Sequence, residues 1–194
     1  MLQAIAYGSH APNPHNTQAW KVELLSDVEA LLFIDERRLL PATDPQARQI
    51  HIGAGCFIET LVVGMSVHGY EAEVEYLPLG PHGFEEIGRK PVARIALAPN
   101  RETGDLLAEF IPLRQSNRKP YRGALLRADE ATQIRRLSKL EHSELRIIAQ
   151  PEEMRPLLDI FRRAWKIEST SRRLFEETRI WFRFNERQRQ TKRD

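Results

Sequence analysis

The residues best suited to chemistry lie in two polar segments about a hundred positions apart. In the first, residues 11–20 (APNPHNTQAW), the rings of Pro12 and Pro14 fix φ and stiffen the chain. The side-chain amides of Asn13, Asn16 and Gln18 offer paired hydrogen-bond donors and acceptors. A stiff loop of this kind suits the edge of a planar heterocycle. The alternative is an ordinary loop that leads into a strand.

The second polar segment is RQSNRKPY, residues 114–121. Arg114 and Arg118 are four positions apart with Ser116 between them, so two guanidinium groups and a hydroxyl come from one loop. These groups suit a phosphate monoester. The segment has no glycine and is therefore not a glycine-rich phosphate loop. The alternative is a solvated basic turn.

Other classes of site find little support in the sequence. Cys56 is the single cysteine, which excludes an internal disulfide and a CxxC site, and we expect it in the core. None of the six histidines falls in an HExxH or HxH pattern, so no metal site is predicted. No serine has a GxSxG setting, and no catalytic side chain is predicted.

The net charge of +2 hides an asymmetry. Residues 1–100 hold 7 Lys and Arg against 12 Asp and Glu, whereas residues 101–194 hold 22 against 15. The basic excess indicates a nucleic-acid surface, an anion site or a chain of two unlike segments. Arginine and glutamate alternate at helical spacing after residue 150, which favours paired helix faces over nucleic-acid binding.

Hydrophobic periodicity predicts an α+β fold for the first hundred residues. A short helix at 2–7 precedes a hairpin, a long apolar helix and two further strands. The predicted strands and long helix are 20–25, 30–34, 45–68, 72–77 and 92–97. We expect an antiparallel or mixed sheet around the long helix.

The predicted helix 45–68 is apolar on all sides, with Asp44 as its N-cap and Pro45 in its first turn. Its glycines, Gly53, Gly55 and Gly64, favour close approach of another backbone or a ligand. We also expect this helix to support self-association. No apolar run reaches the ~20 residues of a membrane span and no leader follows Met1, so we expect no membrane span and a cytoplasmic location.

The second half is predicted to be largely helical. We expect a short helix at 103–112, a loop at 114–122 and an amphipathic helix at 129–140 that buries Ile134, Leu137 and Leu140. A strand is predicted at 144–148 and a helix from Pro151 to the end. Trp181, Phe182 and Phe184 have little following chain to bury them, which indicates either that the natural protein continues or that its helical tail is frayed.

Together the two polar segments resemble motifs of the FMN-dependent nitroreductases. Residues 11–20 resemble that family's P-S-x-x-N-x-Q-P-W loop, with Asn13 in the place of Ser and Ala19 in the place of Pro. Residues 114–121 resemble its R-x-S-x-R-x-F motif, and residues 44–57 resemble its central helix. The order of the two motifs is reversed, as in a branch in which two related halves are fused into a pseudo-dimer.

The resemblance implies a first half at 1–100 and an incomplete second half at 101–194. It implies that Arg114, Ser116 and Arg118 hold the FMN phosphate, and that Pro12, Asn13, Pro14 and Asn16 face the flavin ring. It further implies electron transfer from NAD(P)H to small flat acceptors such as nitroaromatics or quinones. Two alternatives remain: a flavin-binding or storage protein without turnover, and a basic module that binds nucleic acid.

Overall fold

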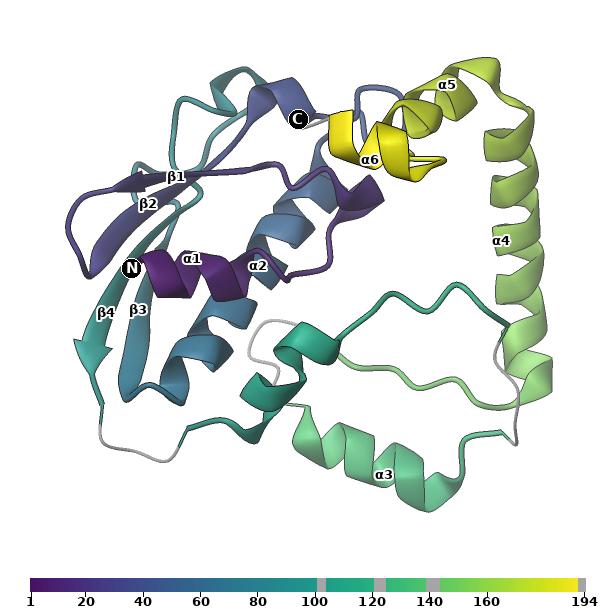
Figure 1. The fold of residues 1–194 in the computed structure, drawn as a ribbon. Coiled ribbons are helices and arrows are strands. Elements are labelled where there is room, and N and C mark those ends of the chain that lie inside the picture. Colours follow the sequence, from purple (N-terminus) through teal and green to yellow (C-terminus); the bar gives the residue numbers. More distant parts are fainter. Residues whose placement is uncertain (101–103, 121–124, 139–143, 192–194) are drawn as a thin grey trace. The chain divides into compact units, whose positions relative to one another are not determined.

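A computed structural model describes residues 1–100, 104–120, 125–138 and 144–191. Figure 1 shows the fold coloured along the sequence. The chain forms two units. The first unit comprises Met1–Ser116 and Glu176–Asp194, and the second comprises Asn117–Phe175.

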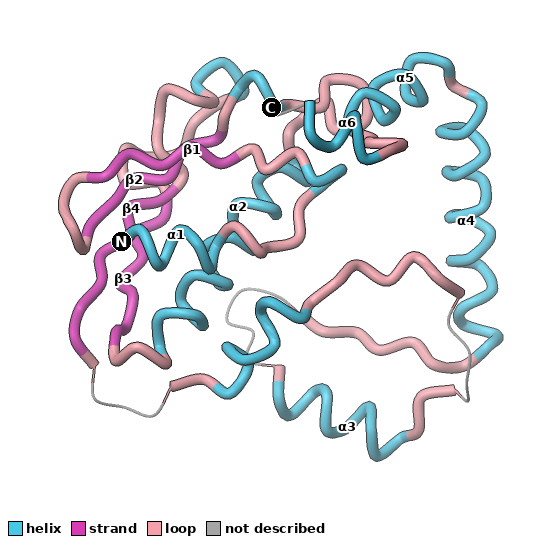
Figure 2. The backbone as a smooth tube through the Cα atoms, viewed as in Figure 1, coloured by secondary structure: helices cyan, strands magenta, loops and turns pink. Residues whose placement is uncertain are grey.

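A four-stranded antiparallel sheet lies in the first unit (Figure 2). Its strands are β1 (Trp20–Leu24), β2 (Glu29–Ile34), β3 (Tyr70–Tyr76) and β4 (Ala93–Pro99), in the spatial order β1-β2-β4-β3. Leu32 lies opposite Ala93 and Val74 lies opposite Ile95. The predicted α+β fold with an antiparallel sheet is therefore confirmed.

The helix α2 (Arg48–Ser66) packs on one face of this sheet, and α1 (Leu2–Gly8) packs along α2. Alternate residues of β2 and β4 point into the core because successive side chains of a strand face opposite sides. The buried core residues of these elements include Leu32, Ile34, Ile50, Phe57, Ile58, Leu61, Met65, Ala93, Ile95 and Leu97. The long apolar helix is thus central, as predicted.

The start of α2 differs from the prediction. Ala47 adopts a left-handed conformation (φ 53°), and the helix begins at Arg48 rather than Pro45. The Asp44 carboxylate nevertheless accepts a hydrogen bond from the Ile50 backbone N–H at 3.0 Å. Asp44 therefore caps the helix as expected, but from a position three residues before Ala47, the residue that directly precedes the helix. The helix ends at Ser66, two residues before the predicted end.

The glycines of α2 differ in what surrounds them. A Cβ on Gly64 would overlap the ring of Tyr7, and one on Gly53 would lie 3.2 Å from Asn13 Cβ. Both glycines allow close approach, as predicted. Gly55 has no atom within 4 Å of a built Cβ, so the prediction is wrong at that position.

By length and composition alone, α2 could cross a membrane. Among the described residues no other helix meets that test. Eight of its residues, including Phe57 and Leu61, are buried against the sheet and α1. Its apolar composition is explained by its place as the core helix.

The remaining elements are 3-10 helices in the first unit and α-helices further along the chain. The 3-10 helices are η1 (Pro14–Asn16), η2 (Glu36–Arg38), η3 (Phe84–Glu86) and η4 (Leu106–Leu113). The later α-helices are α3 (Ala128–Leu137), α4 (Pro151–Thr170), α5 (Arg172–Trp181) and α6 (Glu186–Thr191).

Three predictions for the later part of the chain are wrong. Residues 144–148 form no strand, because the described sheet gives them no partner. The terminal helix is interrupted at Ser171 and again between Trp181 and Glu186. In α3, Ile134 and Leu137 are exposed rather than inward. Leu140 lies outside the described residues.

The end of α5 belongs to the first unit. Trp181 packs against the core, whereas Phe182 and Phe184 remain exposed and stack on each other. The Glu177 carboxylate accepts hydrogen bonds from the backbone N–H groups of Ala42 and Thr43, at 2.8 and 2.7 Å. The Thr43 hydroxyl donates to it as well, at 2.7 Å. Of the three aromatic residues, Trp181 is thus covered by this chain.

Candidate functional site

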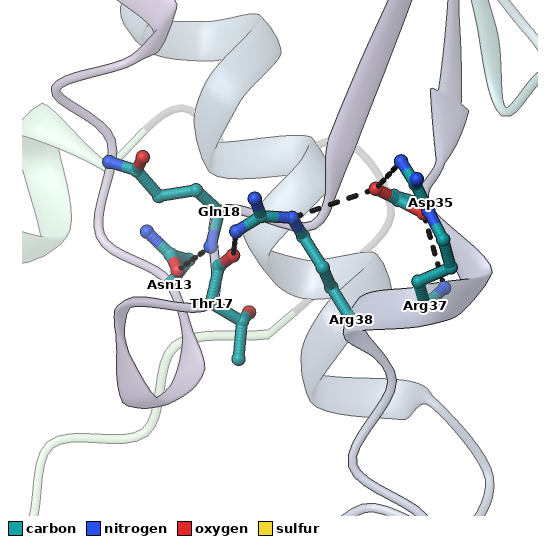
Figure 3. Close-up of polar contacts among 6 residues, drawn as sticks. All are labelled: Asn13, Thr17, Gln18, Asp35, Arg37 and Arg38. Atoms are coloured by element: carbon teal, nitrogen blue, oxygen red, sulfur yellow. Dashed lines mark hydrogen bonds and ion pairs between the residues drawn. The ribbon is translucent and has the colours of Figure 1, made fainter. Parts of the chain in front are cut away.

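The loop between α1 and β1 is closed by one side chain. Asn13 Oδ1 accepts a hydrogen bond from the Gln18 backbone N–H at 2.8 Å, and Asn13 Nδ2 donates to the Ala11 carbonyl at 3.1 Å (Figure 3 shows the first). His15, Asn16 and Gln18 have φ values of 49°, 55° and 49°. Left-handed backbone is uncommon for residues other than glycine. The side chain of Asn13 therefore holds the loop in a tightly turned shape.

The same loop is anchored to the core at several points. Ala11, Thr17 and Ala19 are buried, and Thr17 is fully enclosed. The Thr17 hydroxyl makes no hydrogen bond in the described part of the chain. Because Gly53 of α2 has no side chain, Asn13 can pack closely against this helix. The loop is thus held in place by its packing against the core and the central helix.

An arginine outside the predicted motifs also holds this loop. Arg38 Nη1 donates to the Thr17 carbonyl at 2.8 Å, and Arg38 Nε lies 3.6 Å from Asp35 Oδ2 (Figure 3). Asp35 is buried directly after β2. The Arg37 side chain donates two hydrogen bonds to this carboxylate, and these hold the pKa of Asp35 below its ordinary value.

Sequence reasoning missed Asp35 and Arg38. A usable signal was present, since the charged run Asp35-Glu-Arg-Arg38 directly follows a buried apolar strand. A charge that ends a buried strand needs a partner close by. Only the fold shows that one of these arginines reaches the loop at Thr17, 21 residues earlier.

The four residues predicted to face the flavin ring differ in exposure: two are exposed and two are half-buried. Pro12 and Asn16 are exposed, and the Asn16 amide makes no hydrogen bond to another described residue. Pro14 is half-buried beside Gly53. Asn13 uses its oxygen and one N–H within the loop. The exposed amide of Asn16 is consequently available to bind something else, while Asn13 acts chiefly as a brace.

The three residues predicted to bind the phosphate also differ in their surroundings. Arg114 Nη2 and Nε donate to the His10 carbonyl at 3.1 and 3.3 Å, which places this arginine beside the start of the loop. Ser116 is exposed and belongs to the same unit. Arg118 is exposed and belongs to the second unit. The structure therefore brings Arg114 beside the start of the loop.

Comparison with known proteins gives similarity over part of the chain. No family model matches the sequence. The chain is 31% identical over 120 residues to a Mycobacterium tuberculosis protein named "Putative NAD(P)H nitroreductase acg". It is also 31% identical over 126 residues to the uncharacterized protein Rv3127 of the same organism. The matches cover 61% and 62% of this chain, but only 34% and 35% of those proteins, so it spans about a third of their length.

A solved structure of a nitroreductase-like protein from Streptococcus mutans is also similar. It is 16% identical, with a TM-score of 0.38, over 55% of this chain and 82% of the other. No argument rests on so low a score. Over part of its length, the chain is thus similar in sequence to a protein named as a putative NAD(P)H nitroreductase.

Proposed function

We propose that this chain forms part of an FMN-dependent oxidoreductase of the nitroreductase type. In this proposal it uses NAD(P)H as electron donor and small flat molecules as acceptors. The observation that carries the proposal is a contact of the second predicted segment beside the first: Arg114 binds the backbone carbonyl of His10, directly before the stiff loop at 11–19. The similarity to a protein named as a nitroreductase supports it.

The residues in the first unit fit FMN in two respects. Asn16 offers an uncommitted amide on a loop whose backbone is already fixed, which suits the donor and acceptor edge of a flavin. Arg114 uses its Nε–H and one Nη2–H on His10, so the guanidinium retains three N–H donors for a phosphate. Ser116 adds an exposed hydroxyl two residues later.

Bound FMN would supply the hydride and electron chemistry. This chain would bind and orient it: Pro12, Asn13, Pro14 and Asn16 at the ring, and Arg114, Ser116 and Arg118 at the phosphate. Arg38 would act through the loop, since it fixes the Thr17 carbonyl. No side-chain acid or base is assigned.

The wider organisation belongs to the same proposal. Residues 1–100 would be one nitroreductase-like half and 101–194 the beginning of a second, with the flavin site shared between them. Association through the helix at 45–68 remains part of the proposal, and Ile52 and Val67 expose apolar surface in this region. We propose a cytoplasmic location and no nucleic-acid partner.

An FMN titration of the 194-residue chain tests the proposal, with flavin absorbance and quenching of flavin fluorescence as readouts. We expect binding that R114Q and N16A each weaken about tenfold, the effect of losing about 1.4 kcal/mol. The matched control is R162Q, which changes an exposed arginine paired with Asp159 on α4. Absence of any FMN binding, or equal loss in R162Q, would contradict the proposal.

Turnover separates the two flavin-based functions. The proposed reductase should oxidise NADH or NADPH when a nitroaromatic or quinone is added to the FMN-bound chain. FMN binding without any such oxidation would support the alternative of a flavin-binding or storage protein.

A further inference from the structure

Two histidines face each other in the first unit, and both lie outside the two predicted polar segments. His51 lies in the first turns of α2, and His82 lies in the loop before η3. Their Nε2 atoms are 3.4 Å apart, and their rings are inclined at 35° with centroids 5.6 Å apart. Both side chains are half-buried.

The backbone fixes which nitrogen of His51 carries the proton. His51 Nδ1 lies 2.7 Å from the carbonyl oxygen of Ala47. Because a carbonyl only accepts, Nδ1 must be the donor, and in the neutral ring Nε2 is then an unprotonated lone pair directed at His82. A hydrogen bond from His82 Nε2–H would satisfy that lone pair. It would be long at 3.4 Å, and it would leave the buried Nδ1 of His82 without a donor.

The spacing of the two nitrogens fits a shared metal ion. Imidazole nitrogens bind Zn²⁺ at about 2.0–2.1 Å in tetrahedral sites, which places two such nitrogens roughly 3.4 Å apart. The bond from His51 Nδ1 to a backbone carbonyl is the outer contact that metal-binding histidines commonly make. It holds Nε2 in the form that can bind an ion.

The surroundings leave room for further ligands. Glu86 supplies nearby negative charge, although Lys90 binds its carboxylate at 2.7 Å. A cavity of about 230 Å³ adjoins both histidines and is also lined by Pro45, Gln46 and Phe84.

We propose that His51 and His82 form a two-histidine site for a divalent ion of the Zn²⁺ class, open toward this cavity. The described residues contain no cluster of three or more His, Cys, Asp or Glu side chains that could enclose such an ion. Water or a ligand in the cavity must therefore complete the coordination. The proposal replaces the expectation of no metal site, which rested on sequence spacing, and it is independent of flavin binding.

Calorimetric titration of the chain with Zn²⁺ tests the site, with Mg²⁺ as the comparison ion. We expect one Zn²⁺ per chain, no Mg²⁺ binding, and at least about tenfold weaker Zn²⁺ binding in both H51Q and H82Q. The matched control is H10Q, which changes an exposed histidine and should bind Zn²⁺ as the unaltered chain does. Equal Zn²⁺ affinity in H51Q, H82Q and the unaltered chain would overturn the proposal.

A second measurement avoids the variants. In the unaltered chain, Zn²⁺ should shift the Nε2 nitrogen resonances of His51 and His82 together, with no comparable change at His10. Zn²⁺-dependent shifts confined to other histidines, or absent, would likewise overturn the site.

Discussion

The two units of the chain contain similar apolar side chains but use them differently. The first unit buries residues from α1, α2, β2 and β4 in one core. In the second unit, Ala131 is the only buried residue among those described. The apolar residues of α4 are exposed: Phe161 at 66% and Trp165 at 69%. Periodic apolar residues are therefore sufficient to specify a helix, but a core also requires a second surface that covers them.

The largest contrast should come from one phenylalanine in each unit. Phe57 is fully buried, packs its ring at a tilt against Trp20 and lies over Gly8, so F57A should lower the free energy of unfolding by about 3–5 kcal/mol. F161A on α4 should change it by less than about 0.5 kcal/mol. Urea unfolding followed by Trp fluorescence measures both. Equal losses would show that α4 is buried in solution.

The contact of Glu177 provides the next test. Removing its carboxylate in E177A leaves the N–H groups of Ala42 and Thr43 without their charged acceptor, and should cost about 1.5–3 kcal/mol. E168A, at an exposed position of α4, is the matched control. Limited proteolysis should release the residues after 176 faster in E177A only. Unchanged cleavage would mean that this segment is held by Trp181 alone.

Two glycines of α2 test how tightly the first unit is packed. G64A should destabilise by roughly 1–3 kcal/mol, because the new methyl group overlaps Tyr7. G55A should stabilise by about 1 kcal/mol, since that position has open space and alanine favours the helix. Thermal unfolding of both variants gives the comparison. Two changes of the same sign would contradict the packing of α1 on α2.

The smallest effect concerns pH. The pKa of Asp35 is lowered in the folded chain, so its ionised form adds stability above the ordinary value of 3.8. That contribution is lost as the pH falls below 3.8 through the lower folded pKa. The stability difference between the unaltered chain and D35N should therefore shrink as acid is added. A difference that stays constant with pH would show that Asp35 titrates normally.

Much of the first unit could be predicted from local pattern. The alternation in β2 and the apolar run of α2 identify elements whose residues are buried on the sides expected. The failures need knowledge of distant partners. Residues 144–148 have a strand-like composition but no described strand beside them. In the candidate site, the loop and Arg114 were found from sequence, whereas the contact of Arg38 with Thr17 depends on the fold.

The turned loop at 11–19 has a consequence for the entropy change when it binds a ligand. Its three left-handed residues and the Asn13 brace mean that the conformational entropy of this segment is already lost when the chain folds. A ligand that meets the loop does not have to order it. Binding there should consequently show little of the unfavourable entropy that accompanies the ordering of a flexible loop.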